Sequence, residues 1–149
     1  MLDLYIDADG CPVKDETYRV AQRYQLNVFV VCNRAIAVPV SPRIRLVVVG
    51  RGSDEADKWI AEHAGPGDVV VTGDLPLAAR CIDGGARVVT PRGRIFDAET
   101  IGDALATRDL MTTLRSAGES GGGPPPMGKS DRSVFLSRLD ELVVAAKRA

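Results

Sequence analysis

The sequence has no long hydrophobic segment, and neither sign of charge is in excess. Its longest apolar runs, at residues 28–31 and 46–49, are far shorter than the roughly 20 residues that span a bilayer. No signal peptide precedes the first apolar segment, so we expect a cytoplasmic protein with no membrane partner. The formal net charge of -1 excludes the strongly basic composition of many nucleic-acid-binding proteins, although local basic patches remain compatible with it.

Cysteine and histidine are also scarce. The three cysteines, Cys11, Cys32 and Cys81, are widely spaced and form no Cys-x-x-Cys pair, which indicates reduced thiols without a disulfide partner. With His63 as the single histidine, the chain lacks the ligand spacing of a zinc site. A chain of 149 residues that is 45% hydrophobic can bury a core without disulfides or structural metal, so a bound metal would serve chemistry.

Two hydrophobic periodicities alternate along the chain. Strand-like apolar runs occupy residues 2–6, 28–32, 44–49, 69–72 and 87–89. Helical spacing occurs at residues 13–24, 53–64, 74–82, from Ile101 onward and from Ser130 onward, whereas the segment around Pro39 is expected to cross as a loop. Strands that alternate with helices predict an α/β fold with a mostly parallel sheet flanked by helices in three layers.

The domain organisation follows from one composition change. Residues 118–129 are rich in glycine and proline, which predicts a flexible tether between the α/β domain at residues 1–117 and a last helix at residues 130–149. A single helix follows the tether, so we expect that helix to pack on the same domain. No internal repeat is present.

Acidic residues follow several of the predicted strands. Asp7 and Asp9 come after the first strand, Asp54 and Asp57 fall in the first turn of a later helix, and Asp74 follows the strand at residues 69–72. Ligands of parallel α/β sheets bind beyond the carboxyl ends of the strands, so these acids are expected to converge there. Because clustered carboxylates repel one another, a site of this kind is normally held by a hard cation such as Mg²⁺ or Mn²⁺.

A purely structural role is the alternative for some of these acids. Aspartate between a strand and a helix is a favoured N-cap, and for Asp74 this interpretation stands equal to a site role. Asp54 favours capping and interaction with the helix dipole, whereas Asp57 is less easily explained in this way. Asp7 and Asp9 are separated by one small residue and are hard to explain as two caps, so this pair predicts a site most strongly.

Basic residues near glycine-rich turns and near the last helix are candidate contacts for substrate phosphates, although a solvated surface role is the alternative for each. These candidates are Lys14, Arg51, Arg92, Arg94, Lys129 and Arg132. Trp59 and His63 are interpreted as structural, with His63 near a helix C-terminus.

Several motifs together resemble the YaiI/YqxD family of uncharacterised bacterial proteins, over nearly the whole chain. They are Asp7-Ala8-Asp9-Gly10-Cys11-Pro12, Gly52-x-Asp54-x-x-Asp57, Thr72-Gly73-Asp74-Leu75-Pro76-Leu77-Ala78, Pro91-Arg92-Gly93, Arg108-Asp109-Leu110-Met111, Gly122-Gly123-Pro124 and Asp131-Arg132. That family is similar to PIN-like domains, in which acids at strand ends bind Mg²⁺ or Mn²⁺ and many members cleave RNA. The resemblance implies that Asp7, Asp9, Asp57 and Asp74 would form the catalytic and metal-binding cluster.

Three functions compete at this point. The first is a metal-dependent nuclease that hydrolyses phosphodiester bonds, with RNA as the expected partner. The second, ranked lower, is a phosphomonoesterase with Asp7 as nucleophile and Asp9 as acid/base, because Asp-x-Asp-Gly after a hydrophobic strand also resembles haloacid-dehalogenase-like phosphatases. The third is a non-catalytic module of PIN-like fold that binds nucleic acid or protein.

Overall fold

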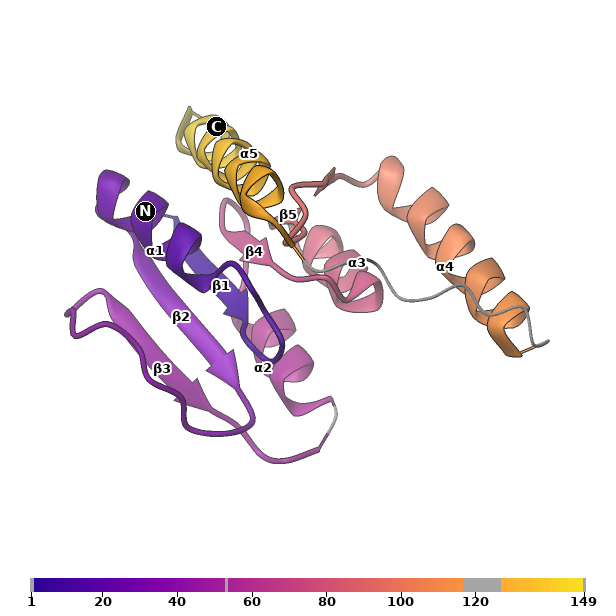
Figure 1. Cartoon of the computed structure of the whole chain (residues 1–149), viewed down its shortest axis with the longest axis horizontal. Helices are drawn as coiled ribbons and strands as arrows, with labels where there is room; N and C mark the ends of the chain where they lie inside the picture. Colours follow the sequence, from indigo (N-terminus) through magenta and orange to yellow (C-terminus); the bar gives the residue numbers. More distant parts are fainter. Residues whose placement is uncertain (1, 53, 117–126, 149) are drawn as a thin grey trace.

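The computed structural model describes residues 2–52, 54–116 and 127–148, which form a sheet with helices on both faces. The strands are β1 (Asp3–Asp7), β2 (Asn27–Cys32), β3 (Ile44–Val48), β4 (Val69–Val71), β5 (Arg87–Val89) and β6 (Ile95–Phe96). The helices are α1 (Lys14–Tyr24), α2 (Glu55–His63), α3 (Leu75–Asp83), α4 (Thr100–Ser116) and α5 (Lys129–Arg148). The predicted three-layer α/β fold is confirmed (Figure 1).

The sheet has the strand order β3-β2-β1-β4-β5-β6, and all neighbouring strands are parallel except β5 and β6. From β1 the chain winds outward through β2 to β3, and α2 then returns it to the other side of β1, where β4 begins. The winding direction therefore reverses between β1 and β4. In open parallel sheets, the carboxyl ends of the strands at such a switch point form the usual ligand crevice.

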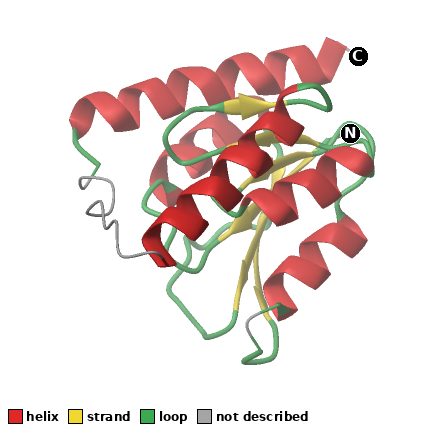
Figure 2. Ribbon diagram, turned by 90° about the vertical axis from the view of Figure 1, so that its right-hand side faces the viewer, coloured by secondary structure: helices red, strands yellow, loops and turns green. Residues whose placement is uncertain are grey.

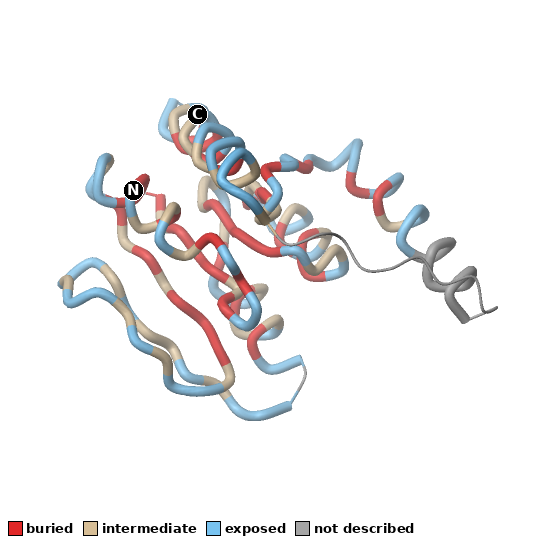
Figure 3. The backbone as a smooth tube through the Cα atoms, viewed as in Figure 1, coloured by how far each residue is buried: buried red, intermediate tan, exposed pale blue. Residues whose placement is uncertain are grey.

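The two faces of the sheet are covered by different helices (Figures 1 and 2). One face packs against α1 and α5, where Leu4 and Ile6 of β1 share a core with Phe135 and Leu139 of α5. The other face packs against α2, α3 and α4, which bury Tyr5 of β1. Successive strand residues point to opposite faces, so β1 contributes to both cores and is buried along most of its length (Figure 3).

Three details differ from the sequence-based expectation or complete it. Residues 33–43 join β2 to β3 without a helix, as predicted for the Pro39 segment. The edge strand β6 was not predicted, because it has only two residues and directly follows a turn at Gly93. Helix α5 begins at Lys129, the last residue of the predicted tether, and residues 118–126 of that tether lie outside the described residues.

Helix α5 packs on the same sheet as the rest of the chain, since Phe135, Leu139 and Val143 are all buried in the core shared with β1. No helix among the described residues is long and apolar enough to cross a membrane. The cysteines Cys11, Cys32 and Cys81 are buried free thiols.

Candidate functional site

The strand register places Asp7 at the switch point. Ile6 pairs with Val71 across β1 and β4, so the next residues, Asp7 and Thr72, also lie beside each other. Both share a sheet face with Tyr5, which is the face covered by α2 and α3. The buried Thr72 hydroxyl donates a hydrogen bond of 2.8 Å to Asp7 Oδ2, which fixes one oxygen of this carboxylate.

Asp74 is connected to the same hydroxyl and caps α3. Its backbone N–H donates to Thr72 Oγ1 at 3.0 Å, and its Oδ1 accepts from the backbone N–H of Leu77 at 3.0 Å. The capping interpretation of Asp74 is therefore confirmed. A capping carboxylate uses one oxygen for the helix, and its charge still raises the pKa of its acidic neighbours, as described below for Asp7 and Asp57.

Asp57 reaches the cluster from α2. Asp57 is half-buried and lies one turn before Ile60, which is buried where α2 packs on the sheet. Asp57 therefore lies near the same face of α2 and points toward the sheet. The pKa of Asp57 is raised to about 6, mainly by burial and also by the nearby charges of Asp74 and Asp7 and by a side-chain hydrogen bond to Asp74. In its protonated form Asp57 donates this bond, so a proton joins the two carboxyl groups.

Asp7 has a similar electrostatic environment. Burial raises its pKa above the ordinary value, the hydrogen bond from Thr72 lowers it, and the charges of Asp74 and Asp9 raise it. Three of the four predicted site acids thus come together from β1, α2 and the start of α3, and the charge of Asp74 raises the pKa of both Asp7 and Asp57.

Asp9 and Asp54 have the smallest effects on the pKa values of Asp7 and Asp57, respectively. Asp9 is exposed and accepts a hydrogen bond from the backbone N–H of Asn33 at 3.1 Å, which ties the loop after β1 to the loop after β2. Of the groups that shift the pKa of Asp7, Asp9 has the smallest effect. Asp54 occupies the N-cap position of α2 but makes no side-chain cap hydrogen bond, so the expected capping bond is absent there.

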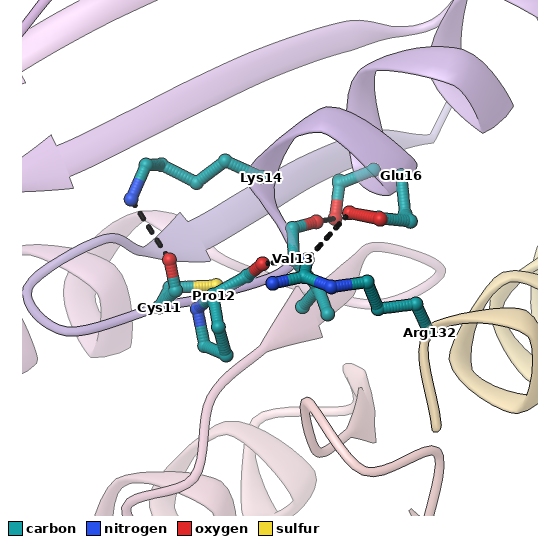
Figure 4. Close-up of polar contacts among 7 residues, drawn as sticks. Cys11, Pro12, Val13, Lys14, Glu16 and Arg132 are labelled. Carbon is teal, nitrogen blue, oxygen red and sulfur yellow. Dashed lines mark hydrogen bonds and ion pairs between the residues drawn. The ribbon is translucent and has the colours of Figure 1, made fainter. Parts of the chain in front are cut away.

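Two of the basic candidates contact the loop that follows β1. Lys14 Nζ donates to the carbonyl oxygen of Cys11 at 2.8 Å, and Arg132 Nη1 donates to the carbonyl oxygen of Pro12 (Figure 4). Arg132 also lies 3.5 Å from Glu16 Oε1 in an ion pair. These two side chains therefore support the loop that carries Asp9.

The other basic candidates surround the loop after β5 or lie in solvent. Arg92 is 3.9 Å from Asp131 of α5, and the Arg94 guanidinium lies 4.6 Å from the centroid of the Phe96 ring. The remaining two are exposed: Arg51 after β3 and Lys129 at the start of α5.

Sequence reasoning missed Thr72 and the partner of His63. Thr72 directly follows the apolar run of β4 and precedes Gly73-Asp74. A hydroxyl side chain at this strand end was the signal in the sequence that could have identified it. His63 stacks on Trp59 with ring centroids 3.7 Å apart, which supports a structural role for both.

The fold and the acidic cluster define a three-layer α/β protein whose carboxylates meet at the switch point of a parallel sheet. A family model described as "Uncharacterized BCR, YaiI/YqxD family" matches residues 5–145, and the chain belongs to this family. No solved structure matches this chain.

Curated bacterial relatives match over nearly their full length. A protein of Azorhizobium caulinodans is 56% identical over 148 residues, which cover 99% of this chain and 93% of the relative. A protein of Brucella ovis is 55% identical over 98% of this chain and 91% of the relative, and one of Caulobacter sp. is 55% identical over 99% and 98%. All three bear the name "UPF0178 protein", which states no activity.

Proposed function

We propose that this protein is an Mg²⁺- or Mn²⁺-dependent nuclease that hydrolyses phosphodiester bonds, with RNA as substrate. The observation that carries the proposal is the meeting of Asp7, Asp57 and Asp74 at the switch point, where the charge of Asp74 raises the pKa of both Asp7 and Asp57. Charge repulsion and desolvation both disfavour this arrangement in the absence of a cation. Such a cost is typical of a functional site rather than of a structural one.

The chemistry of the donors fits a hard divalent cation. Carboxylate oxygens are the ligands that Mg²⁺ and Mn²⁺ prefer, and Asp7, Asp57 and Asp74 supply them from three different elements. Within residues 2–52, 54–116 and 127–148, no group of three acidic, histidine or cysteine side chains forms a preformed metal site. Binding would therefore require these side chains to move, and Asp7, Asp57 and Asp74 would then hold the cation through their carboxylate oxygens.

Each acid would have a defined part in the reaction. Asp7, held by Thr72, would be the best-oriented ligand, while Asp57 would lose its proton as the metal enters. Asp9 would complete the cluster from the exposed loop after β1. When bound, the cation supplies Lewis-acid stabilisation of the phosphate and lowers the pKa of an attacking water.

Basic residues on neighbouring loops would hold the substrate backbone. Arg51 follows β3, and Arg92 and Arg94 flank the turn after β5. Arginine side chains therefore lie on both sides of the acids along the carboxyl edge of the sheet. Lys14 and Lys129 would add positive potential, whereas the Arg132 guanidinium is engaged by the Pro12 carbonyl and Glu16. Contacts of this kind attract phosphates irrespective of base sequence.

The test is cleavage of a fluorescent single-stranded RNA by the full chain with Mn²⁺, with Mg²⁺ and with EDTA. Wild type is expected to cleave only with metal, and Asp7→Asn is expected to lose cleavage. Asp83→Asn is the matched control, since Asp83 is an exposed acid at the opposite end of α3 from Asp74.

Other outcomes would redirect the assignment. Metal binding and RNA binding without cleavage would identify a non-catalytic binding module. A phosphorylated or fluoride-mimic adduct on Asp7 would identify the phosphomonoesterase, because a metal nuclease needs no covalent intermediate.

A further inference from the structure

The first turns of α5 reach two separate loops at the carboxyl edge of the sheet. Asp131 approaches Arg92 in the loop after β5, at 3.9 Å, while the next residue, Arg132, contacts the loop after β1. The loop after β5 also packs directly on α5, since a Cβ added to Gly93 would lie 3.0 Å from Val134 Cγ1. The helix therefore bridges the connections that follow β1 and β5, on either side of β4.

Of Asp131 and Arg132, Arg132 makes the closer contacts with the loop that it reaches. Its Nη1 donates to the carbonyl oxygen of Pro12 and lies 3.5 Å from Glu16 Oε1 (Figure 4). The Arg132 side chain is 40% exposed and that of Glu16 only 13%. Arginine suits this task because its planar guanidinium presents several donors with fixed geometry and keeps its charge.

The loop that Arg132 contacts is also tied to β2 and the residue after it, because the backbone N–H of Ala8 donates to Val31 at 2.9 Å and that of Asn33 donates to Asp9 at 3.1 Å. Between β1 and α1, the backbone N–H of Cys11 donates to Ala8 at 3.1 Å, and Gly10 adopts a φ of +75° that side-chain-bearing residues rarely take. Lys14 bonds the carbonyl of Cys11 from within the loop's own helix, whereas Arg132 brings a bond from 120 residues away in sequence. Arg132 is thus a long-range anchor of this loop.

We propose that Arg132 is a positioning residue for the acidic site, which it serves through the turn at Cys11 and Pro12 rather than through the substrate. By holding the Pro12 carbonyl and Glu16, it fixes the path of residues 8–13 and with it the orientation of Asp9 and the end of β1 at Asp7. The effect of Arg132 on metal binding rests on the proposed function, whereas its anchoring of the loop does not depend on catalysis.

The test compares Arg132→Gln, Arg132→Lys and Arg138→Gln in the full chain. Arg138 is the matched control, because it lies on the same helix, forms an ion pair with Glu141 of α5, and packs its stem near Gly93 rather than near residues 8–13. The measurements are hydrogen–deuterium exchange of a peptide covering residues 8–13, the melting temperature, and Mn²⁺ affinity by calorimetry.

In Arg132→Gln, the amides of residues 8–13 are expected to exchange about tenfold faster, while peptides from β2 and from the second half of α5 stay unchanged. Mn²⁺ affinity should fall about fivefold, Arg132→Lys should recover most of both losses, and Arg138→Gln should match wild type. A uniform rise of exchange across the chain, or no change at residues 8–13, would overturn the proposal.

The two proposals fail in different ways. If wild type does not bind Mn²⁺, the proposed function is wrong, and the exchange of residues 8–13 still decides the role of Arg132. If Mn²⁺ binds equally well to wild type and Arg132→Gln while the loop loosens, Arg132 anchors the loop without positioning the acids.

Discussion

Acidic residues at the two ends of the sheet have very different environments. At the amino end, before β4, both oxygens of Asp68 accept backbone N–H groups, from Asp3 and from Gly65, each at 2.9 Å. At the carboxyl end, a side-chain bond of Asp57 is to another carboxyl group, that of Asp74. Asp68 joins two segments of backbone, whereas the charge of Asp74 disfavours the charged form of Asp57.

This difference separates a structural aspartate from a candidate ligand. A carboxylate that accepts backbone N–H groups stabilises the fold in its charged form. A carboxylate that faces other carboxylates is more stable when protonated, and it becomes favourable as a charge only when a cation is present. Substitutions at the two ends should therefore have opposite consequences for stability and for metal binding.

The largest effect is expected from Asp7→Asn. Removing the charge of the acid at the end of β1 should weaken Mn²⁺ binding at least about 100-fold, because the amide is a poorer ligand for a hard cation. Calorimetric titration measures this change, with Asp83→Asn as control. Equal affinity in wild type and Asp7→Asn would show that Asp7 is not a ligand.

The next largest effect is a loss of stability from a substitution at the amino end of the sheet. Asp68→Ala removes the acceptor of two backbone N–H groups and should lower the free energy of unfolding by about 2 kcal/mol. Urea denaturation measures this loss. Mn²⁺ affinity should stay at the wild-type value, and a parallel loss of metal binding would contradict the separation of the two ends.

Metal binding should also depend on pH. Since the pKa of Asp57 is raised to about 6, protons compete with the cation below that pH. Mn²⁺ affinity is expected to rise about tenfold between pH 5 and pH 7, as the proton on Asp57 is lost. In Asp57→Asn the residual affinity should lose most of this dependence, and an unchanged pH profile in that variant would argue against Asp57.

The smallest effect is a gain of stability in Asp57→Asn. A carboxyl whose pKa is raised on folding adds stability below its unfolded pKa, and this contribution disappears as the pH rises through about 6. The asparagine amide can donate to Asp74 at every pH, so the melting temperature at pH 7 should rise by about 2–4 °C. Differential scanning calorimetry at pH 4 and pH 7 measures it, and the gain should be absent at pH 4.

The arrangement of strands and helices was largely predictable, because buried parallel strands and amphipathic helices carry strong periodic signals. The position of the acids at strand ends was also visible. The strand β6 was not, since two residues give no period and pairing with β5 alone creates it. The crossing from β2 to β3 was predictable as a loop because prolines exclude helix there.

The particular roles of side chains were less accessible to sequence. Asp54 and Asp74 both sit at N-cap positions, yet only Asp74 makes the capping bond, and this depends on local backbone geometry. Thr72 becomes important only through the register that places it beside Asp7. Arg132 contacts Pro12 across 120 residues, a pairing that no local pattern reveals.

The most direct test of a cation site at the carboxyl edge is calorimetric titration of Mn²⁺ at pH 6 in two buffers with different heats of ionisation. Wild type is expected to bind Mn²⁺ and to release about half a proton, because Asp57 is half protonated near its pKa of about 6. Asp57→Asn should bind far more weakly and lose most of this proton release. No binding by wild type, or equal binding by Asp57→Asn, would contradict the account.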